Sequence, residues 1–304
     1  MICYWKSSFE SKRINFNKGV NMIVVTGANG KLGQLVIKDL IQRKGAHQIV
    51  AAVRQPEKAI ELKQIGVEVR QADYNKPDSL VQAFSGADQV LLISSSEIGQ
   101  REAQHKAVIQ AAQKAGVKHI VYTSILGADK STLGLSKEHL ATEKEIIKSG
   151  LTYTILRNGW YLENHTENMG AALEHGVVLG AAGEGQFSSA SRADYAAAAA
   201  QVLTSSGHEN KIYELAGSQS FTLKKYAEEL SVLSGKNIVY KNMPEKEFEN
   251  VLMTFGLPQA FANLLADSDT GASKGGLFSS SNELSVLIGR PTMTLAQSIQ
   301  QHLK

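Results

Sequence analysis

Apolar residues along the chain gather in short β-branched runs, separated by longer stretches with helical, amphipathic spacing. Runs of the first kind predict strands, at 22–27, 47–54, 67–74, 87–95, 117–125 and 151–159. The stretches between them predict helices, at 32–45, 56–66, 76–86, 99–116 and 136–150. Because strand and helix alternate strictly, we expect a parallel sheet with helices on both faces, a doubly wound, Rossmann-like α/β architecture.

The alternation weakens after Gly159. A strand is still predicted at 211–217 and a helix at 222–235, whereas 241–278 is expected to form a helix, a loop and a glycine-rich segment, DTGASKGGLF. We therefore predict a main domain over residues 22–159. Residues 160–304 are expected to form mainly a smaller C-terminal α/β lobe, with some segments returning to the main sheet.

Composition excludes several classes of protein. The chain has 304 residues, 43% of them hydrophobic, which is enough for a sizeable core. No apolar run approaches the roughly 18 residues of a membrane-spanning helix, so no membrane span is predicted. Cys3 is the single cysteine, which excludes an intrachain disulfide and a thiolate metal cage. This usage suits a reducing compartment, and we expect a cytoplasmic protein.

The net charge of +3 comes from the first 21 residues. Four basic residues oppose one acid there, Glu10, and the rest of the chain is neutral, so nothing predicts nucleic-acid binding. Residues 1–21 also lack the apolar core of a secretory signal. We expect this segment to be a non-native or frayed extension rather than a targeting signal.

The stretch VVTGANGKLG places three glycines at three-residue intervals between the first strand and the first helix. Gly27 allows the tight turn, Gly30 lets backbone N–H groups approach a diphosphate, and Gly33 lets the helix lie close to the sheet. The spacing is GxxGxxG rather than the commoner GxGxxG, and three such glycines could serve packing alone. In the first βαβ unit of an alternating fold, however, the pattern indicates dinucleotide binding.

The end of the second predicted strand selects the dinucleotide. An NAD site usually has an acid there for the ribose 2′-hydroxyl, but this chain has Arg54, with Lys58 four residues later. A guanidinium can bind a 2′-phosphate that a carboxylate would repel, so NADP(H) is the predicted cofactor; the alternative is a solvated loop arginine. At the ends of the next two strands, Asp73 could accept from the adenine amino group and the 94–97 turn could reach the ribose and nicotinamide, unless both are merely polar loops.

Seven motifs in order carry a resemblance to a known family: TGANGKLG, AAVRQPEKA, QADY, LLISSSE, ILRNGWYLEN, ASRADYAAAAA and ASKGGLF. With them the chain resembles the NmrA-like atypical short-chain dehydrogenase/reductases, and within these the bacterial NADPH-dependent quinone oxidoreductases (type 2) and triphenylmethane reductase. The resemblance implies an enzyme that transfers hydride from NADPH to a quinone or a quinone-like dye. It implies substrate stacking near Trp160 and Tyr161, and cofactor contacts from Gly27, Ala28, Asn29, Gly30, Lys31, Leu32, Arg54, Ser94, Ser95, Ser96, Glu97 and Asn158.

The chain departs from this family in its catalytic pair. Ordinary short-chain dehydrogenases use Tyr-x-x-x-Lys, in which Lys holds the nicotinamide ribose and Tyr donates a proton. In HLATEK the lysine is expected to be Lys144, and Leu140 then stands where the tyrosine would be. Reduction of a quinone or a cationic dye needs no strong general acid, which agrees with the loss. Ser124, at the end of the fifth strand, is expected in the place of the family's catalytic serine.

Other candidates are expected to be structural, and one alternative function stays open. His139 and Glu143 have a spacing that can bind metal, but without a third ligand we expect a solvated helix face and no metal site. Arg192 and Asp194 are expected to pair with each other. The alternative function is an NADP(H)-binding redox sensor without turnover. No flavin is expected, and the oligomeric state stays open, with a homodimer as one option.

Overall fold

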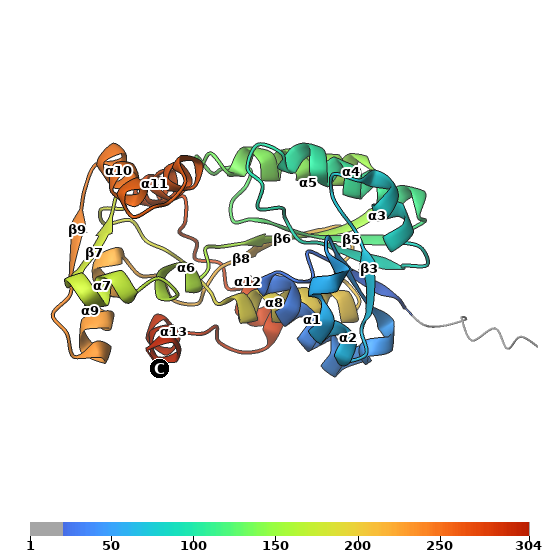
Figure 1. Cartoon of the computed structure of the whole chain (residues 1–304), viewed down its shortest axis with the longest axis horizontal. Helices are drawn as coiled ribbons and strands as arrows, with labels where there is room; N and C mark the ends of the chain where they lie inside the picture. The colour runs from blue at the N-terminus through green and yellow to red at the C-terminus, as the bar shows by residue number, and fades with distance from the viewer. Residues whose placement is uncertain (1–20, 304) are drawn as a thin grey trace, which may run out of the picture.

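Seven parallel strands form the central sheet of the computed structural model, which describes residues 21–303 (Figure 1). The predicted extension therefore lies outside the described residues, except for Asn21. The strand order is β3-β2-β1-β4-β5-β6-β8. The strands are β1 (Ile23–Thr26), β2 (Ile49–Val53), β3 (Glu68–Gln71), β4 (Gln89–Leu92), β5 (His119–Ile125), β6 (Thr152–Asn158) and β8 (Lys211–Leu215). This confirms the doubly wound, Rossmann-like fold.

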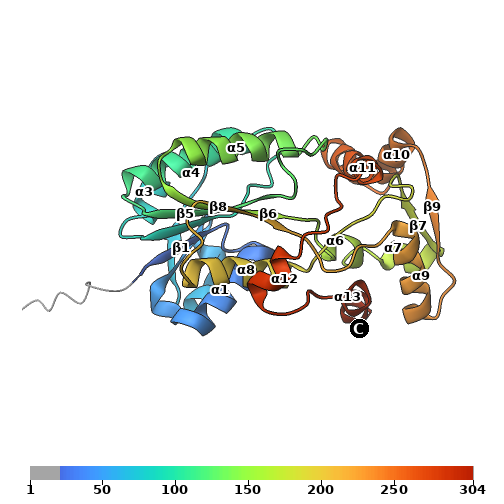
Figure 2. The same cartoon turned by 180° about the vertical axis from the view of Figure 1, so that it is seen from behind.

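Helices cover both faces of the sheet, as the two views show (Figures 1 and 2). One face carries α1 (Lys31–Lys44), α2 (Ile60–Gln64), α8 (Arg192–Thr204) and α12 (Glu283–Ile288), and the other α3 (Pro77–Ala83), α4 (Arg101–Lys114) and α5 (Ser136–Lys148). In β1, Ile23 and Val25 pack with the first group while Val24 packs with the second. Burial on both faces explains why the inner strands β1 and β2 are largely apolar, whereas the outer strands β3 and β8 are more polar and more exposed.

The second lobe is built on a small parallel pair of strands, β7 (Val177–Gly180) and β9 (Val239–Asn242). Six helices surround this pair: α6 (Glu163–Thr166), α7 (Gly170–His175), α9 (Leu223–Ser234), α10 (Glu245–Thr254), α11 (Gln259–Ser273) and α13 (Leu295–His302). Its core contains Phe187, Phe221 and Tyr226. Two short 3-10 helices, η1 (Ala46–Gln48) and η2 (Pro56–Lys58), complete the main part.

Three segments from beyond residue 159 return to the main part. Strand β8 pairs with β6 along its whole length, and α8 and α12 cover the sheet near it. The chain therefore passes between the two parts several times (Figure 1). Within residues 21–303, no helix combines the length and apolar character that a membrane crossing requires.

The first half of the glycine-rich segment 269–278 is helical. Helix α11 continues to Ser273, and Gly271 lies within it. A Cβ atom on Gly271 would lie 2.1 Å from the Leu133 side chain. This glycine therefore permits close packing of α11 against the loop before α5, rather than breaking the helix.

Candidate cofactor site

A cavity of about 540 Å³ opens at the carboxyl ends of β1, β2, β3 and β4. Strand β1 lies between β2 and β4, so the order of the strands reverses there. In open α/β sheets, ligands bind in the crevice at such a switch point. The position of this cavity therefore fits a nucleotide site.

Most of the predicted cofactor residues line this cavity. They are Gly27, Ala28, Asn29, Gly30, Lys31, Leu32, Gly33, Arg54, Asp73, Ser94, Ser95, Ser96 and Glu97, and the predicted substrate residue Tyr161 lines it as well. Asn158, Trp160, Ser124 and Lys144 do not line it. The fold thus brings together the ends of four strands that lie far apart in sequence.

The glycine loop has the geometry of an anion cradle. Gly27 has a φ of +59°, and its carbonyl oxygen accepts a bond from the Gly30 N–H at 2.9 Å. A Cβ atom on Gly33 would lie 2.5 Å from that same oxygen and 2.8 Å from the Ala28 Cα atom. Helix α1 begins directly after Gly30 with no side-chain cap, so its first N–H groups are free to bind an anion.

Basic side chains surround the cradle, and three of them have acidic partners. Lys31, Arg54, Lys58 and Arg192 all line the cavity. The Arg54 guanidinium donates from Nη1 to the Glu97 carboxylate at 2.9 Å. Because these four cations outnumber the two acids of the lining, Asp73 and Glu97, the site favours a negatively charged ligand.

Tyr74 lines the cavity and was not predicted. Its hydroxyl donates to the Ile93 carbonyl at 2.8 Å and lies 2.6 Å from the Thr26 Oγ1 atom. It therefore joins the ends of β1, β3 and β4. Burial raises the pKa of this phenol well above its usual value, so it stays protonated. Its place directly after Asp73 in the QADY motif is the signal that could have identified it.

Arg192, another residue not predicted for the site, closes one side of the cavity. It donates to Glu167 at 2.8 Å, and Glu167 also accepts from Lys31 of the glycine loop at 2.7 Å. The guanidinium lies 5.0 Å from the centre of the Tyr161 ring, a cation–π contact. The expected Arg192–Asp194 pair is wrong, because Asp194 instead pairs with Arg290 at 2.6 Å.

Lys144, which is expected to hold the nicotinamide ribose, does not line this cavity. It is exposed on α5, and the buried face of that helix carries His139, Thr142 and Glu143. The same burial corrects the prediction of a solvated His139–Glu143 face. The helix turns so that Leu140 and Lys144 are not among the residues facing the sheet. The spacing of Leu140 and Lys144 alone could not show which side of the helix is buried.

A buried charge cluster lies at the ends of β5 and β6. Arg157, which is 7% exposed, donates to Glu143 at 2.7 Å and to Glu214 at 2.7 Å. Burial alone would lower the pKa of Arg157, but these bonds raise it. The Ser124 hydroxyl donates to Glu143. Since the single Ser124 proton is used there, Ser124 can offer only its acceptor lone pairs to any other group.

Asn158 and Trp160 lie beside the cavity rather than in its wall. Asn158 is buried at the end of β6, and among the described residues its side-chain oxygen has no hydrogen-bond partner. A buried acceptor of this kind needs a donor from a ligand or a water. Trp160 packs against the core of the second lobe.

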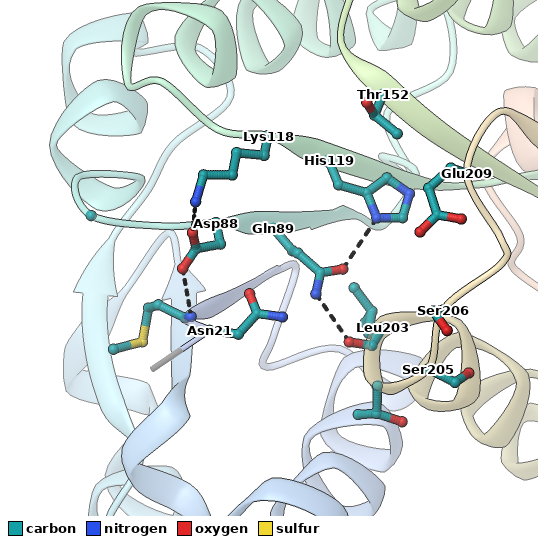
Figure 3. A pocket seen from close by; sticks show the side chains of 13 residues that line it. Asn21, Asp88, Gln89, Lys118, His119, Thr152, Leu203, Ser205, Ser206 and Glu209 are labelled. Carbon is teal, nitrogen blue, oxygen red and sulfur yellow. Dashed lines mark hydrogen bonds and ion pairs between the residues drawn. The ribbon is translucent and has the colours of Figure 1, made fainter. Parts of the chain in front are cut away.

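A larger cavity, of about 1100 Å³, lies at the opposite, amino-terminal edge of the sheet (Figure 3). Four of its polar side chains form two pairs: Lys118 donates to Asp88 at 2.6 Å, and His119 lies 3.2 Å from the Gln89 side-chain oxygen. No glycine cradle or helix N-terminus described above faces this edge. We therefore assign the candidate site to the smaller cavity at the carboxyl edge.

Comparison with known proteins agrees with this assignment. A family model described as NAD(P)H-binding matches residues 27–206. Quinone oxidoreductase 2 of Escherichia coli is 56% identical over 278 residues, covering 91% of this chain and 97% of that protein. The E. coli NADPH-dependent quinone oxidoreductase solved with NADPH superposes with a TM-score of 0.91 at 55% identity, covering 93% of this chain and 100% of that one. Triphenylmethane reductase of Citrobacter sp. gives 0.89 at 41% identity, covering 93% and 99%.

Proposed function

The chain belongs to the NAD(P)H-binding, NmrA-like family, and on that premise we propose that it is an NADPH-dependent reductase of quinones or quinone-like dyes. The observation that carries the proposal is the cavity itself, where a glycine cradle and four cations meet at the switch point of the sheet. A redox sensor without turnover is not favoured, because the relatives described above are reductases.

The residues present fit NADP(H). The close approach of Gly33 to the Gly27 carbonyl leaves room only for hydrogen, which lets the start of α1 face a diphosphate. Arg54, aided by Lys58, would hold the 2′-phosphate, since both cations stand where an NAD site has an acid. Asp73 would accept from the adenine amino group. The unpartnered oxygen of Asn158 would accept from an amide N–H.

Bound NADPH supplies the hydride in such a reaction. The chain itself contributes position and exclusion of water. Tyr161 would form one wall for a flat acceptor, held in place by the Arg192 guanidinium 5.0 Å away. Burial raises the pKa of Tyr161, so its phenol keeps its proton at neutral pH. Because the Ser124 hydroxyl donates its proton in a hydrogen bond to Glu143, Ser124 would accept a hydrogen bond from the substrate rather than donate one.

Steady-state assays test this proposal. NADPH oxidation is followed with benzoquinone, with a triarylmethane dye and with no acceptor, and acceptor-dependent turnover is expected. Arg54→Ala should lower the NADPH-over-NADH preference by about tenfold, the lower end of the value of a charge-assisted hydrogen bond, because Arg54 is largely exposed. Arg43→Ala, at the far end of α1, is the matched control. Tight NADPH binding without turnover of any acceptor would favour the sensor.

A further inference from the structure

The ion pair between Arg54 and Glu97 bridges two loops of the candidate site. Arg54 follows β2 and Glu97 lies beyond the end of β4, and β1 runs between those two strands. Their side chains meet at 2.9 Å, and both line the cavity. The guanidinium expected to bind a 2′-phosphate therefore already has a carboxylate partner.

Glu97 is a fixed partner. Its second carboxylate oxygen accepts from the Gln104 side chain at 2.8 Å, and Gln104 is 3% exposed. The Gln104 amide nitrogen also lies within hydrogen-bond distance of the Asn75 side-chain oxygen, at 3.2 Å. These contacts hold the carboxylate in place from the buried side of the loop.

The turn that carries Glu97 is itself held by α4. The Ser95 N–H donates to His105 Nε2 at 2.9 Å, and Arg101 donates to the Ser95 carbonyl at 2.8 Å. Both of these α4 side chains are buried. Burial lowers the pKa of His105 to about 3, so Nε2 keeps the lone pair that accepts this bond at neutral pH. These bonds favour the position of the turn in which Glu97 faces Arg54.

We propose that Glu97 limits the preference for NADPH over NADH by competing with the 2′-phosphate for Arg54. This inference rests on the proposed function. To bind the guanidinium, a 2′-phosphate must share it with this carboxylate or displace the carboxylate from it. The 2′-hydroxyl of NADH carries no such charge, so NADH binding leaves the ion pair intact, and a carboxylate oxygen can accept from a ribose hydroxyl. Glu97 therefore weakens the preference for NADPH that Arg54 creates.

The test is Glu97→Gln, which removes the charge and keeps an oxygen that can accept from Gln104. Calorimetry with 2′,5′-ADP and with 5′-AMP, which differ only in the 2′-phosphate, isolates that group from the rest of the cofactor. We expect the 2′,5′-ADP-over-AMP preference to rise by about two- to fivefold, the range set by a partly exposed ion pair. Glu102→Gln, an exposed residue of α4 that does not line the cavity, should leave the preference unchanged.

Repeating the substitution with Arg54→Ala present separates competition from simple repulsion. In that background we expect Glu97→Gln to have little effect on the preference. An equal rise with and without Arg54 would overturn the inference, as would an unchanged preference in the single variant. If the wild-type protein binds neither NADPH nor 2′,5′-ADP, the proposed function falls and takes this inference with it. An unchanged preference with normal NADPH binding refutes the inference alone.

Discussion

Replacing Asp269 with asparagine should make the folded protein more stable at neutral pH. Asp269 lies on α11, and its carboxylate accepts from the Ala181 N–H at 2.9 Å, just beyond β7. Burial raises its pKa to about 6, against an ordinary value of 3.8, although the Ala181 bond opposes this. Compared with the unfolded chain, the folded state therefore favours the protonated, neutral form of Asp269.

The size and sign of the effect follow from this difference. A pKa difference of one is worth about 1.36 kcal/mol, so ionising Asp269 costs the folded state at most ~3 kcal/mol. Its contribution to stability is largest below the unfolded-state pKa, falls as the pH rises from 3.8 to about 6, and stays low above that. Because the side chain keeps some exposure, we expect Asp269→Asn to gain about 1–3 kcal/mol at pH near 7.

Urea unfolding of the wild type and the variant across this pH range measures the effect. The difference in the free energy of unfolding should be near zero at the acidic end and should grow until the pH passes about 6. Asp78→Asn, at an exposed position of α3, is the control, because water already solvates that carboxylate. A difference that does not change with pH would refute the argument from burial.

Three further substitutions test other features. Gly33→Ala places a methyl group 2.5 Å from the Gly27 carbonyl, so we expect a loss of about 1–3 kcal/mol and weaker NADPH binding, measured by thermal unfolding and titration. Glu143→Gln removes the charge that faces the buried Arg157, so we expect the free energy of unfolding in urea to fall by about 3 kcal/mol. A fall below ~0.5 kcal/mol would mean that this ion pair does not stabilise the fold. Lys144→Ala should leave the Michaelis constant for NADPH unchanged and the free energy of unfolding within about 0.5 kcal/mol of wild type, because Lys144 is exposed. A loss of NADPH affinity would mean that Lys144 does hold the nicotinamide ribose.

The inner part of the main sheet could be predicted from sequence because β1 and β2 are buried along their whole length. Such strands have to be largely apolar, and a short apolar run is visible without knowledge of distant contacts. The outer strands β3 and β8 are more polar and more exposed. Once the strand order is known, Gly27, Arg54, Asp73 and the 94–97 turn must meet, since all of them follow parallel strands at one edge. This part of the site was therefore predictable.

The remaining part depends on contacts between distant segments. Which face of α5 is buried is decided by packing on the sheet, and the spacing of His139, Leu140 and Lys144 does not reveal it. Arg192 contacts Glu167 and Tyr161 only because the chain returns from the second lobe as α8. Gly271 looks like a loop residue until its contact with Leu133 is known.

Strand β8 has a consequence for how this molecule could be divided. A cut after residue 159 would remove the neighbour of β6 and expose a new sheet edge, with its unpaired N–H and C=O groups. The released fragment would in turn carry α8 without α1 to cover it. Neither piece would be an independent building block, so we expect calorimetry to record one melting transition for the entire chain.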